Sequence, residues 1–190
     1  MTRELTVHAG ATAPAWRSIS AMAGVVLASA LVAACSSGSS RVDGGRQKVT
    51  TYSPRVVAYG EPVPKGGGRY KLGRPYYVGG RRYVPRRDPG YARTGIASWY
   101  GRDFHGRLTA NGEVYDMYGL SAAHPTLPLP SLVEVTNIRT GRRVIVRVND
   151  RGPFARGRII DLSYRAAQEL GIVQKGTGEV HVRYLRPAPL

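Results

Sequence analysis

The second half of the chain contains several short stretches in which apolar and polar residues alternate. Successive side chains of a β-strand point to opposite faces, so this period of two predicts strands that bury one face. The stretches predicted as strands are residues 95–101, 132–138, 142–150, 157–163 and 179–185. Within the third of them, Val144, Val146 and Val148 are in phase and are expected to line a core.

Local signals predict how these strands are joined. The RTG sequence between 132–138 and 142–150 predicts a tight turn, and hence a hairpin. The sequence SYRAAQELG predicts one short helix, with Ser163 as its N-cap and Gly171 as its stop. The apolar face of that helix consists of Ala166, Ala167 and Leu170. Several short strands and one helix over residues 95–190 predict a small β-barrel with one core and no second domain.

An acidic residue continues the apolar row of the strand predicted at 142–150. Asp150 has the same parity as Val148, and Gly152 and Pro153 end the strand immediately after it. We therefore expect its carboxyl group at the rim of the barrel interior, where partial removal from water raises its pKa. A carboxylic acid that stays protonated near neutral pH can act as a general acid. The alternative is a structural role, in which Asp150 accepts backbone N–H bonds in the turn.

Polar residues gather in the segment before these strands, residues 104–130. With Thr109 and Gly112 inside it, the segment is expected to be an ordered loop rather than a long helix, and such loops are often functional. Its candidate residues are His105, Asn111, Glu113, Asp116 and His124. Zinc binding is the main alternative, but no histidine pair has helical spacing and Cys35 is the only cysteine. A Ser-His-Asp triad is also disfavoured, because its nucleophile-elbow sequence is absent. We expect no metal and no cofactor.

The N-terminus has the pattern of an export signal. Arg17 precedes an apolar run, ISAMAGVVLASALVAA, which is too short for a comfortable membrane span of about 20 residues. It predicts a secretory signal peptide over residues 1–34, with an N-terminal membrane anchor as the alternative. The VAAC sequence resembles a bacterial lipoprotein signal, which implies lipidation of Cys35; a free thiol is the alternative. Ser36 after the cysteine implies sorting to the outer membrane, as in Gram-negative lipoproteins.

Residues 35–94 have the composition of a tether. The first part is rich in Ser and Gly and predicts a flexible linker, and the rest mixes Arg, Tyr, Gly and Pro. The chain has 28 basic and 12 acidic residues, a formal net charge of +16, and residues 41–94 account for +10 of it. Anionic lipid or cell wall is therefore an expected neighbour, whereas nucleic acid is not the expected partner of an exported protein. The sequence PYYVGGRRYVP can form a small hairpin that turns at Gly79-Gly80.

Six motifs, in order, carry a resemblance to a known family. They are GIASWYG, FHGRLTANGEVYD, SAAHPTLPLP, VEVTN, GRRVIVRVNDRGPF and RIIDLSYRAAQELG. These motifs resemble those of the rare lipoprotein A family, septal-ring-type lytic transglycosylases of the bacterial cell envelope. The YKLGRPYYVGGRRYVP sequence also resembles the lead-in of many members. The resemblance implies a mainly β fold: a six-stranded double-psi β-barrel with one or two short helices.

The resemblance also implies a reaction and the residues that perform it. The β-1,4 bond between N-acetylmuramic acid and N-acetylglucosamine would be cleaved by the 6-hydroxyl of the muramic sugar, which leaves a 1,6-anhydro end. The family's functional positions map onto Asp150, Glu113 and His124. One acid/base can serve both steps, and we expect Asp150 in that role. Glu113 would stabilise positive charge or tune Asp150, and His124 would orient a carboxylate or bind sugar.

Other residues are expected around these three. The expected substrate-binding residues are Asn111, Tyr100, His105 and Arg151. Trp99 and Phe104 are further candidates for stacking on sugar rings, although Trp99 fits a core position equally well. Asp161 is expected to be structural and to hold the start of the helix, and Asp116 fits either role.

Together, the local patterns and the resemblance divide the chain into a signal peptide (1–34), a tether that begins at the lipidated Cys35 (35–94) and the catalytic barrel (95–190). Many family members continue into a peptidoglycan-binding repeat domain, which is not expected here because the sequence ends at Leu190. Septal localisation and a preference for glycan without stem peptides therefore stay open. The expected partners are peptidoglycan glycan strands and the membrane, with division-site proteins as further candidates. The alternatives to an enzyme are a non-lytic, expansin-like peptidoglycan binder and an envelope scaffold.

Overall fold

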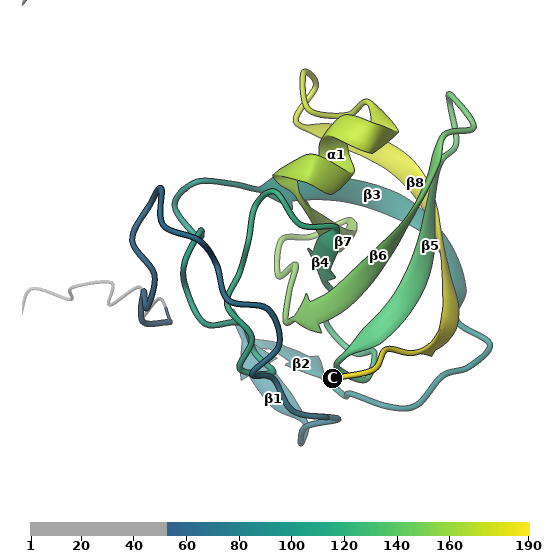
Figure 1. Ribbon diagram of the computed structural model, residues 1–190. Helices are drawn as coiled ribbons and strands as arrows, with labels where there is room; N and C mark the ends of the chain where they lie inside the picture. Colours follow the sequence, from purple (N-terminus) through teal and green to yellow (C-terminus); the bar gives the residue numbers. More distant parts are fainter. Residues whose placement is uncertain (1–52) are drawn as a thin grey trace, which may run out of the picture. The chain divides into compact units, whose positions relative to one another are not determined.

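Six strands close into a barrel in the part of the chain that the computed structural model describes, residues 53–190 (Figure 1). The elements are β1 (Tyr76–Val78), β2 (Arg81–Tyr83), β3 (Ala92–Tyr100), β4 (Ser121–Ala123), β5 (Ser131–Asn137), β6 (Arg143–Asp150), β7 (Arg158–Ser163), α1 (Tyr164–Leu170) and β8 (Thr177–Pro187). The strand order around the barrel is β3-β7-β4-β6-β5-β8, and β1 and β2 form a separate two-stranded sheet. The predicted mainly β fold, a six-stranded barrel with a short helix, is confirmed.

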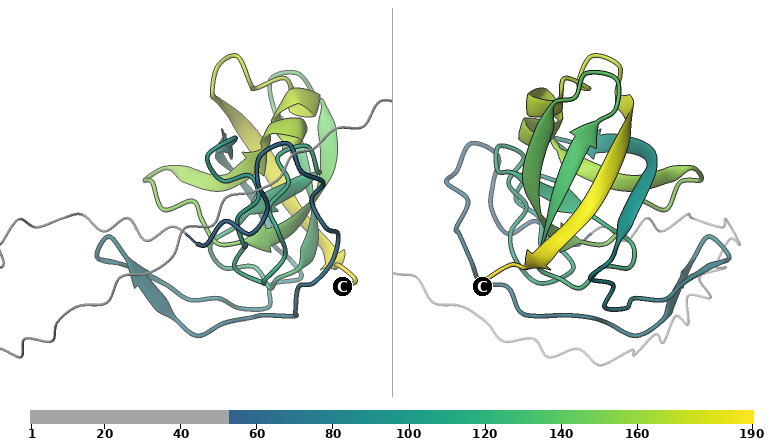
Figure 2. Two further views of the ribbon diagram at one scale, coloured as in Figure 1. Left: turned by 60° about the vertical axis from the view of Figure 1, so that its left-hand side comes forward. Right: turned by 90° about the vertical axis from the view of Figure 1, so that its right-hand side faces the viewer.

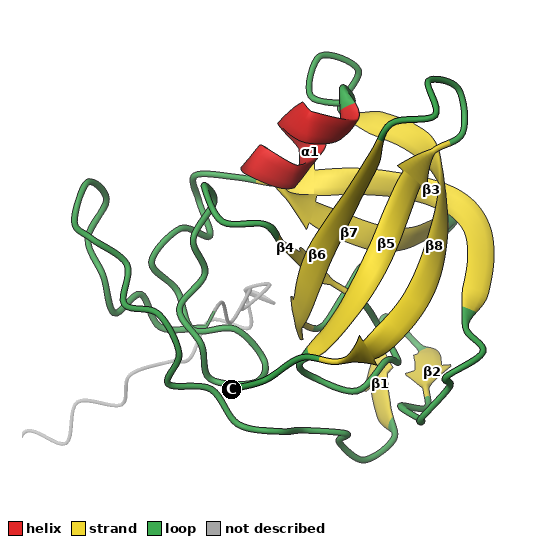
Figure 3. Cartoon of the chain, turned by 45° about the vertical axis from the view of Figure 1, so that its right-hand side comes forward, coloured by secondary structure: helices red, strands yellow, loops and turns green. Residues whose placement is uncertain are grey.

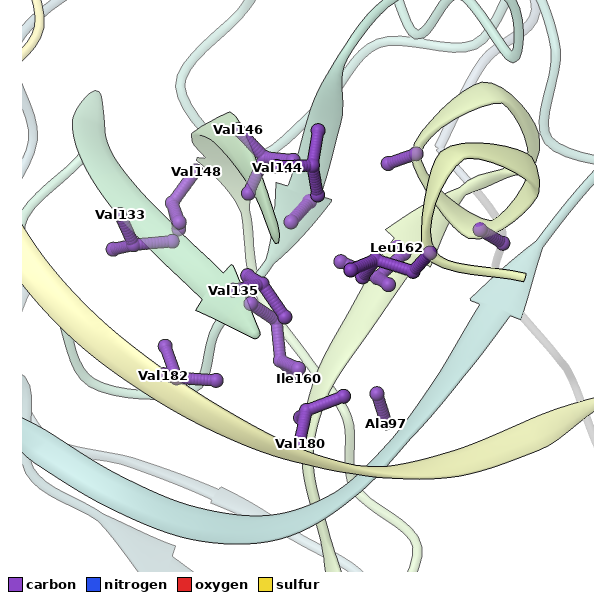
Figure 4. Packing of buried hydrophobic residues seen from close by; sticks show 14 of the residues in the cluster. Ala97, Val133, Val135, Val144, Val146, Val148, Ile160, Leu162, Val180 and Val182 are labelled. Atoms are coloured by element: carbon purple, nitrogen blue, oxygen red, sulfur yellow. The ribbon is translucent and has the colours of Figure 1, made fainter. Parts of the chain in front are cut away.

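The predicted hairpin of β5 and β6 forms one wall of the barrel. The two strands are antiparallel, with Val133 opposite Val146 and Val135 opposite Val144. All four side chains are buried and point into the barrel, where they meet valines of β8 and the apolar residues of β7 (Figure 4). Burying one such side chain stabilises the fold by about 1.5–3 kcal/mol. The alternation read from the sequence therefore identifies the inner face correctly.

Two pairs of barrel strands run parallel, β3 with β7 and β4 with β6, and the remaining pairs are antiparallel. Parallel neighbours require crossover connections rather than tight turns. The long connection from β3 to β4, residues 101–120, leaves the barrel wall and packs outside it (Figure 3). This connection carries Glu113, so the topology itself brings a loop residue against the outer face of the barrel.

The helix α1 begins and ends where its capping residues predict. Ser163 is the N-cap, and its Oγ accepts a hydrogen bond from the N–H of Ala166 at 3.2 Å. Gly171 follows the last turn in the left-handed conformation, with φ of 70°, which glycine adopts without a Cβ penalty. The face predicted to be apolar, which contains Ala167 and Leu170, is fully buried.

One barrel strand was not predicted. Residues 104–130 are predicted to be a loop, whereas the structure places β4 inside this segment, between β6 and β7 of the barrel. This strand has three residues, and all of them are buried, so it shows no alternation of apolar and polar positions. Its pairing partners, which include Val148 and Leu162 opposite Ala122, are remote in the sequence. Tertiary pairing rather than local pattern therefore defines β4.

Residues 53–91, which precede the barrel, run along its outside (Figure 2). The N–H of Arg69 donates to the carbonyl of Asn111 at 2.9 Å. Lys71 and Leu129 exchange backbone hydrogen bonds of 2.7 and 2.9 Å and form an isolated bridge. The described part of the expected tether thus contacts the two loops that carry the candidate residues.

The hairpin expected at Gly79-Gly80 is present as the antiparallel pair of β1 and β2. The two glycines have φ values of 56° and 76°, the left-handed region that such a turn requires. The first barrel strand begins at Ala92, slightly before the boundary expected at Gly95, because Ala92 pairs with Arg183 of β8. Exposed polar residues at this end of the strand hide it from a hydrophobic pattern.

The predicted signal peptide, Cys35 and the first part of the tether lie outside the described residues. Within residues 53–190, no helix is both long enough and apolar enough to cross a membrane.

Candidate active site

Asp150 is the last residue of β6, and two backbone N–H groups hold its side chain. The N–H groups of Ala110 and Arg151 both donate to Oδ1 at 2.8 Å. Burial raises the pKa of the half-buried carboxyl group above its usual 3.8, although these hydrogen bonds, the Arg151 guanidinium and the Lys71 ammonium act in the opposite direction. The two interpretations of this residue therefore coexist: Asp150 caps the turn, and it keeps its proton to a higher pH than an exposed aspartate.

A β-bulge sets the direction of Asp150. Between β4 and β6 the register shifts, so that Ala122 pairs with Val148 and Ala123 with Asp150. Asn149 is the extra residue on β6, and it is buried like Val148 before it. Bulges often re-aim side chains next to active sites. Here the bulge directs two adjacent polar side chains to different partners.

Glu113 lies in the connection between β3 and β4, where donors surround its carboxylate. Arg147 donates from Nη2 to Oε1 at 2.7 Å and from Nε to both oxygens at 3.1 and 3.0 Å. Asn111 donates to Oε1 at 2.8 Å, and Asn149 donates to Oε2 at 2.9 Å. Burial alone would raise the pKa of Glu113, but these hydrogen bonds outweigh it and hold the pKa below the usual 4.5. Glu113 is therefore a charged, fully hydrogen-bonded carboxylate.

His124 follows β4 and is almost completely buried. Its backbone N–H donates to the carbonyl of Asp150 at 3.0 Å, and its Nδ1 accepts N–H bonds from Thr126 at 3.2 Å and Leu127 at 3.0 Å. Burial, assisted by the nearby Arg151, lowers the pKa of the imidazole to about 3. A neutral imidazole in this position orders the turn beside Asp150.

The two carboxyl groups belong to one connected structure. Asn149 and Asp150 are neighbours on β6, and Ala110 and Asn111 are neighbours in the loop. Asn149 and Asp150 are both hydrogen-bonded to the loop. The Asp150 carboxyl group accepts the N–H of Ala110, and the Asn149 carbonyl accepts the N–H of Asn111 at 3.3 Å. The Asn111 side chain then reaches Glu113. A shift of this loop would therefore move the hydrogen-bond partners of both acids together.

Known proteins resemble this chain over the barrel. Residues 92–184 match a family model described as a lytic transglycolase. A Pseudomonas aeruginosa protein named "Endolytic peptidoglycan transglycosylase RlpA" is 54% identical over 127 residues, which cover 66% of this chain and 37% of that protein. Proteins with the same name are 46% identical over 158 residues in Vibrio cholerae (82% of this chain, 60% of that protein) and 55% identical over 115 residues in Neisseria meningitidis (60% and 48%).

The chain belongs to the rare lipoprotein A family. It spans between 37% and 60% of the length of these three relatives.

Three of the four residues predicted to bind substrate have their polar groups engaged within the protein. Asn111 is fully buried beside Glu113. His105 is also buried, and its Nδ1 accepts the N–H of Met117 at 3.2 Å. Arg151 donates to three backbone carbonyls, those of Leu72, His124 and Leu127. These contacts order the loops around Asp150, so substrate contact by these residues stays a prediction.

The aromatic residues near the end of β3 differ in exposure. Tyr100, the fourth predicted binding residue, stacks on Tyr115 with ring centres 4.2 Å apart. Burial, followed in size by the charge of Asp150, raises the pKa of its hydroxyl well above 10. Phe104 is 37% exposed and makes a T-shaped contact with Tyr100, whereas Trp99 packs against the core. Phe104 is thus the most exposed of the three candidate rings.

The other two acids weighed in the sequence have local partners. Asp161 accepts a hydrogen bond from Ser98 at 2.5 Å and pairs with Arg158 at 3.5 Å, rather than with the start of the helix. Asp116 accepts the N–H of Tyr118 at 2.9 Å. Within residues 53–190, no cluster of three or more His, Cys, Asp or Glu side chains is arranged to hold a metal ion.

Sequence reasoning missed two cations that shape the site. Arg147 lies on the outward face of β6, and its parity with Asn149 was the available signal that donors line this face. Lys71 comes from the segment treated as a tether, and its Nζ donates to the carbonyl of Ala110 at 2.8 Å. The same residue, Ala110, donates its N–H to Asp150. The lead-in therefore helps to fix the loop that binds the acid.

Proposed function

We propose that the protein is an endolytic lytic transglycosylase of peptidoglycan. It cleaves the β-1,4 bond between N-acetylmuramic acid and N-acetylglucosamine and leaves a 1,6-anhydro end on the muramic sugar. The observation that carries the proposal is the pair of connected carboxyl groups, of which Asp150 has a raised pKa and Glu113 a lowered one. Two carboxyl groups whose environments push their pKa values apart mark an acid and a charge-stabilising group. The names of the three relatives support the same activity.

Asp150 is the acid and then the base of the reaction. Its carboxyl proton goes to the glycosidic oxygen as the bond from that oxygen to the anomeric carbon breaks, which releases the N-acetylglucosamine side. The 6-hydroxyl of the muramic sugar then attacks the anomeric carbon, and its proton goes to the Asp150 carboxylate. No water is consumed, and the side chain ends in the protonation state in which it began. This proton transfer accounts for about 10²–10⁴-fold in rate.

Glu113 acts on the same centre through charge and position. Its carboxylate favours the positive charge that develops on the sugar ring, although Arg147 offsets part of this effect. Its second contribution is to hold the Asn111 turn, which presents the Ala110 N–H to Asp150. His124 is neutral and orders the turn on the other side of Asp150.

The cell envelope is the proposed site of action, with Cys35 as a lipid anchor that holds the barrel at the outer membrane, facing the periplasm. The tether then lets the barrel reach glycan strands, and division-site proteins are candidate partners. The test is fractionation of cells that express the wild type or Cys35→Ser. Wild-type protein in the outer-membrane fraction and the variant in the soluble periplasmic fraction support the anchor, and identical distributions would rule it out.

Digestion of purified sacculi tests the activity. Sacculi with and without stem peptides are incubated with the protein, and the released fragments are identified by mass spectrometry. Fragments with 1,6-anhydro ends that disappear with Asp150→Asn support the transglycosylase. Retention of the protein on sacculi without any release would instead favour a non-lytic binder, and release of fragments with reducing ends would indicate hydrolysis by water.

A further inference from the structure

The β1–β2 hairpin is fixed beside the turn that follows Asp150. The rings of Tyr76 and Tyr83 stack with centres 5.3 Å apart. Both meet Phe154 in T-shaped contacts, with ring centres 6.1 and 5.4 Å apart, and the Tyr76 hydroxyl donates to the carbonyl of Pro125 at 2.7 Å. Figures 1 and 3 show the hairpin at the same end of the barrel as the end of β6. The aromatic contacts therefore attach the hairpin next to the proposed acid.

A hollow of about 720 Å³ lies between the hairpin and the β6–β7 loop. It is lined by Val78, Gly79, Gly80, Arg81, Phe154 and Arg156. The charged groups in this lining are two guanidinium groups, with no carboxylate among them. The hollow thus combines concentrated positive charge with an aromatic ring that is 41% exposed.

Neither arginine of the hollow has a counter-ion among residues 53–190. Arg81 is exposed and lies over the Tyr83 ring, with 5.4 Å between the guanidinium carbon and the ring centre. Arg156 is exposed on the loop after Phe154. Arg147 differs from these two arginines, because its guanidinium group forms an ion pair with Glu113. The two free guanidinium groups are therefore available to an external anion.

The chemistry of the hollow fits an acidic glycan. A guanidinium group binds a carboxylate through parallel, charge-assisted hydrogen bonds. An exposed aromatic ring offers an apolar face to the C–H groups of a sugar ring. Peptidoglycan carries both partners on one strand, sugar rings and the carboxyl groups of its lactyl ethers or stem peptides. An anion without sugar rings would use only half of these contacts.

We infer that the β1–β2 hairpin and the β6–β7 loop form a subsite that extends the Asp150 site and binds carboxylates of the peptidoglycan strand through Arg81 and Arg156, with Phe154 against a sugar ring. The inference rests on the proposed function and adds to it a recognition element that lies partly outside the matched family domain, residues 92–184. The subsite holds the strand while Asp150 acts on a neighbouring bond.

The test measures binding separately from cleavage. In the full chain with Asp150→Asn, the dissociation constant for sacculi is measured by co-sedimentation with and without Arg81→Gln/Arg156→Gln. The matched control is Arg139→Gln/Arg143→Gln, which removes two exposed arginines at or just before the opposite end of β6. It therefore has the same net charge as Arg81→Gln/Arg156→Gln. Each variant is also tested on sacculi whose carboxyl groups have been converted to neutral amides. Circular dichroism melts check that all variants fold.

We expect Arg81→Gln/Arg156→Gln to weaken binding at least about tenfold on native sacculi, and to have no effect on the amidated ones. The control should bind like its parent on both. An unchanged affinity, an equal loss in the control, or an equal loss on amidated sacculi would each overturn the subsite. Release is measured separately with the protein that retains Asp150, so the outcomes also separate the subsite from the proposed function. Release of 1,6-anhydro ends by that protein, together with an inert arginine pair, refutes the subsite alone. Arginine-dependent binding without release by that protein refutes the enzyme alone.

Discussion

Asp150 and Glu113 are both carboxyl groups withdrawn from water, yet their pKa values move in opposite directions. The difference lies in their partners. Glu113 receives a guanidinium group and two side-chain amides, whereas Asp150 receives two backbone N–H groups on one oxygen. Burial is common to both, so the protonation state depends on whether the donors outweigh the loss of water.

This contrast assigns the two acids to different kinds of work. A carboxylate that stays charged and fully hydrogen-bonded is suited to positioning a loop and to providing a constant negative electrostatic potential. A group that keeps its proton, with one oxygen bonded to backbone, is suited to proton transfer. Substitutions of the two acids and of their partners can test this division.

The largest effect should be on catalysis, and it should separate the two residues. Asp150→Asn removes the transferable proton but keeps an oxygen for the Ala110 N–H, so release of anhydro fragments should fall about 10²–10⁴-fold with little loss of stability. Glu113→Gln should reduce release less and lower stability more, since Arg147 loses its counter-ion. Release rates and urea unfolding of both variants check this. Equal activity losses together with equal stabilities would contradict the division.

Removal of Arg147 should give the largest loss of stability. Arg147→Met leaves the Glu113 carboxylate buried without its cation, which should cost about 3 kcal/mol of unfolding free energy. The double variant Arg147→Met/Glu113→Gln removes both charges and should recover most of that loss, because a neutral amide is less costly to bury. Urea unfolding of the wild type, both single variants and the double variant provides the cycle. A double variant no more stable than Arg147→Met would show that the ion pair is not what Glu113 requires.

A smaller effect should follow from crowding Glu113 through the lead-in. A Cβ at Gly68 would lie 2.7 Å from Cγ of Glu113 and 2.8 Å from Nδ2 of Asn111. Gly68→Ala should therefore cost about 1–3 kcal/mol and lower release by displacing the Glu113 network. Gly90→Ala is the matched control, since Gly90 lies in the same lead-in and a Cβ there meets nothing within 4 Å. Similar stabilities of the two alanine variants would indicate that residues 68–70 do not pack on Glu113 in solution.

The fold and the site were predictable to different degrees from the sequence. The inner face of β6 followed from the period of two at Val144, Val146 and Val148, because a local pattern records burial directly. The cap of α1 at Ser163 was equally local. The strand β4 escaped prediction because its neighbours on both sides are remote in the sequence and all its residues are buried.

The partners of the two acids were less predictable for the same reason. Parity with Val148 predicted a withdrawn Asp150 with a raised pKa, but the bulge at Asn149, which the sequence does not reveal, sets its direction. The charged state of Glu113 depends on Arg147, which lies far along the chain. Lys71 was assigned to a tether by composition, although it contacts Ala110. Long-range hydrogen bonds leave no periodic trace in the sequence. Residue identities therefore indicated two candidate acids, and the structure indicated how their surroundings shift their pKa values.

The smallest expected effect is the pH dependence of stability, which should have opposite signs for the two acids. The lowered pKa of Glu113 stabilises the fold above its usual value of 4.5, and this contribution is lost as the pH falls through the folded-state pKa. Asp150 behaves in reverse: its contribution is complete below its usual 3.8 and is lost as the pH rises through the raised folded-state pKa. For each group, the unfolding free energy can change by at most about 1.4 kcal/mol per pH unit.

Urea unfolding between pH 3 and pH 7 measures the unfolding free energy of the wild type relative to each variant. As the pH rises, this free energy should increase relative to Glu113→Gln and decrease relative to Asp150→Asn. His124, with a pKa of about 3 instead of the usual 6.5, itself adds stability as the pH rises between these two values. It is present in the wild type and in both variants, so its contribution cancels from each comparison. Two trends of the same sign would mean that burial alone governs both carboxyl groups. In that case Asp150 would have no better claim to the transferable proton than Glu113.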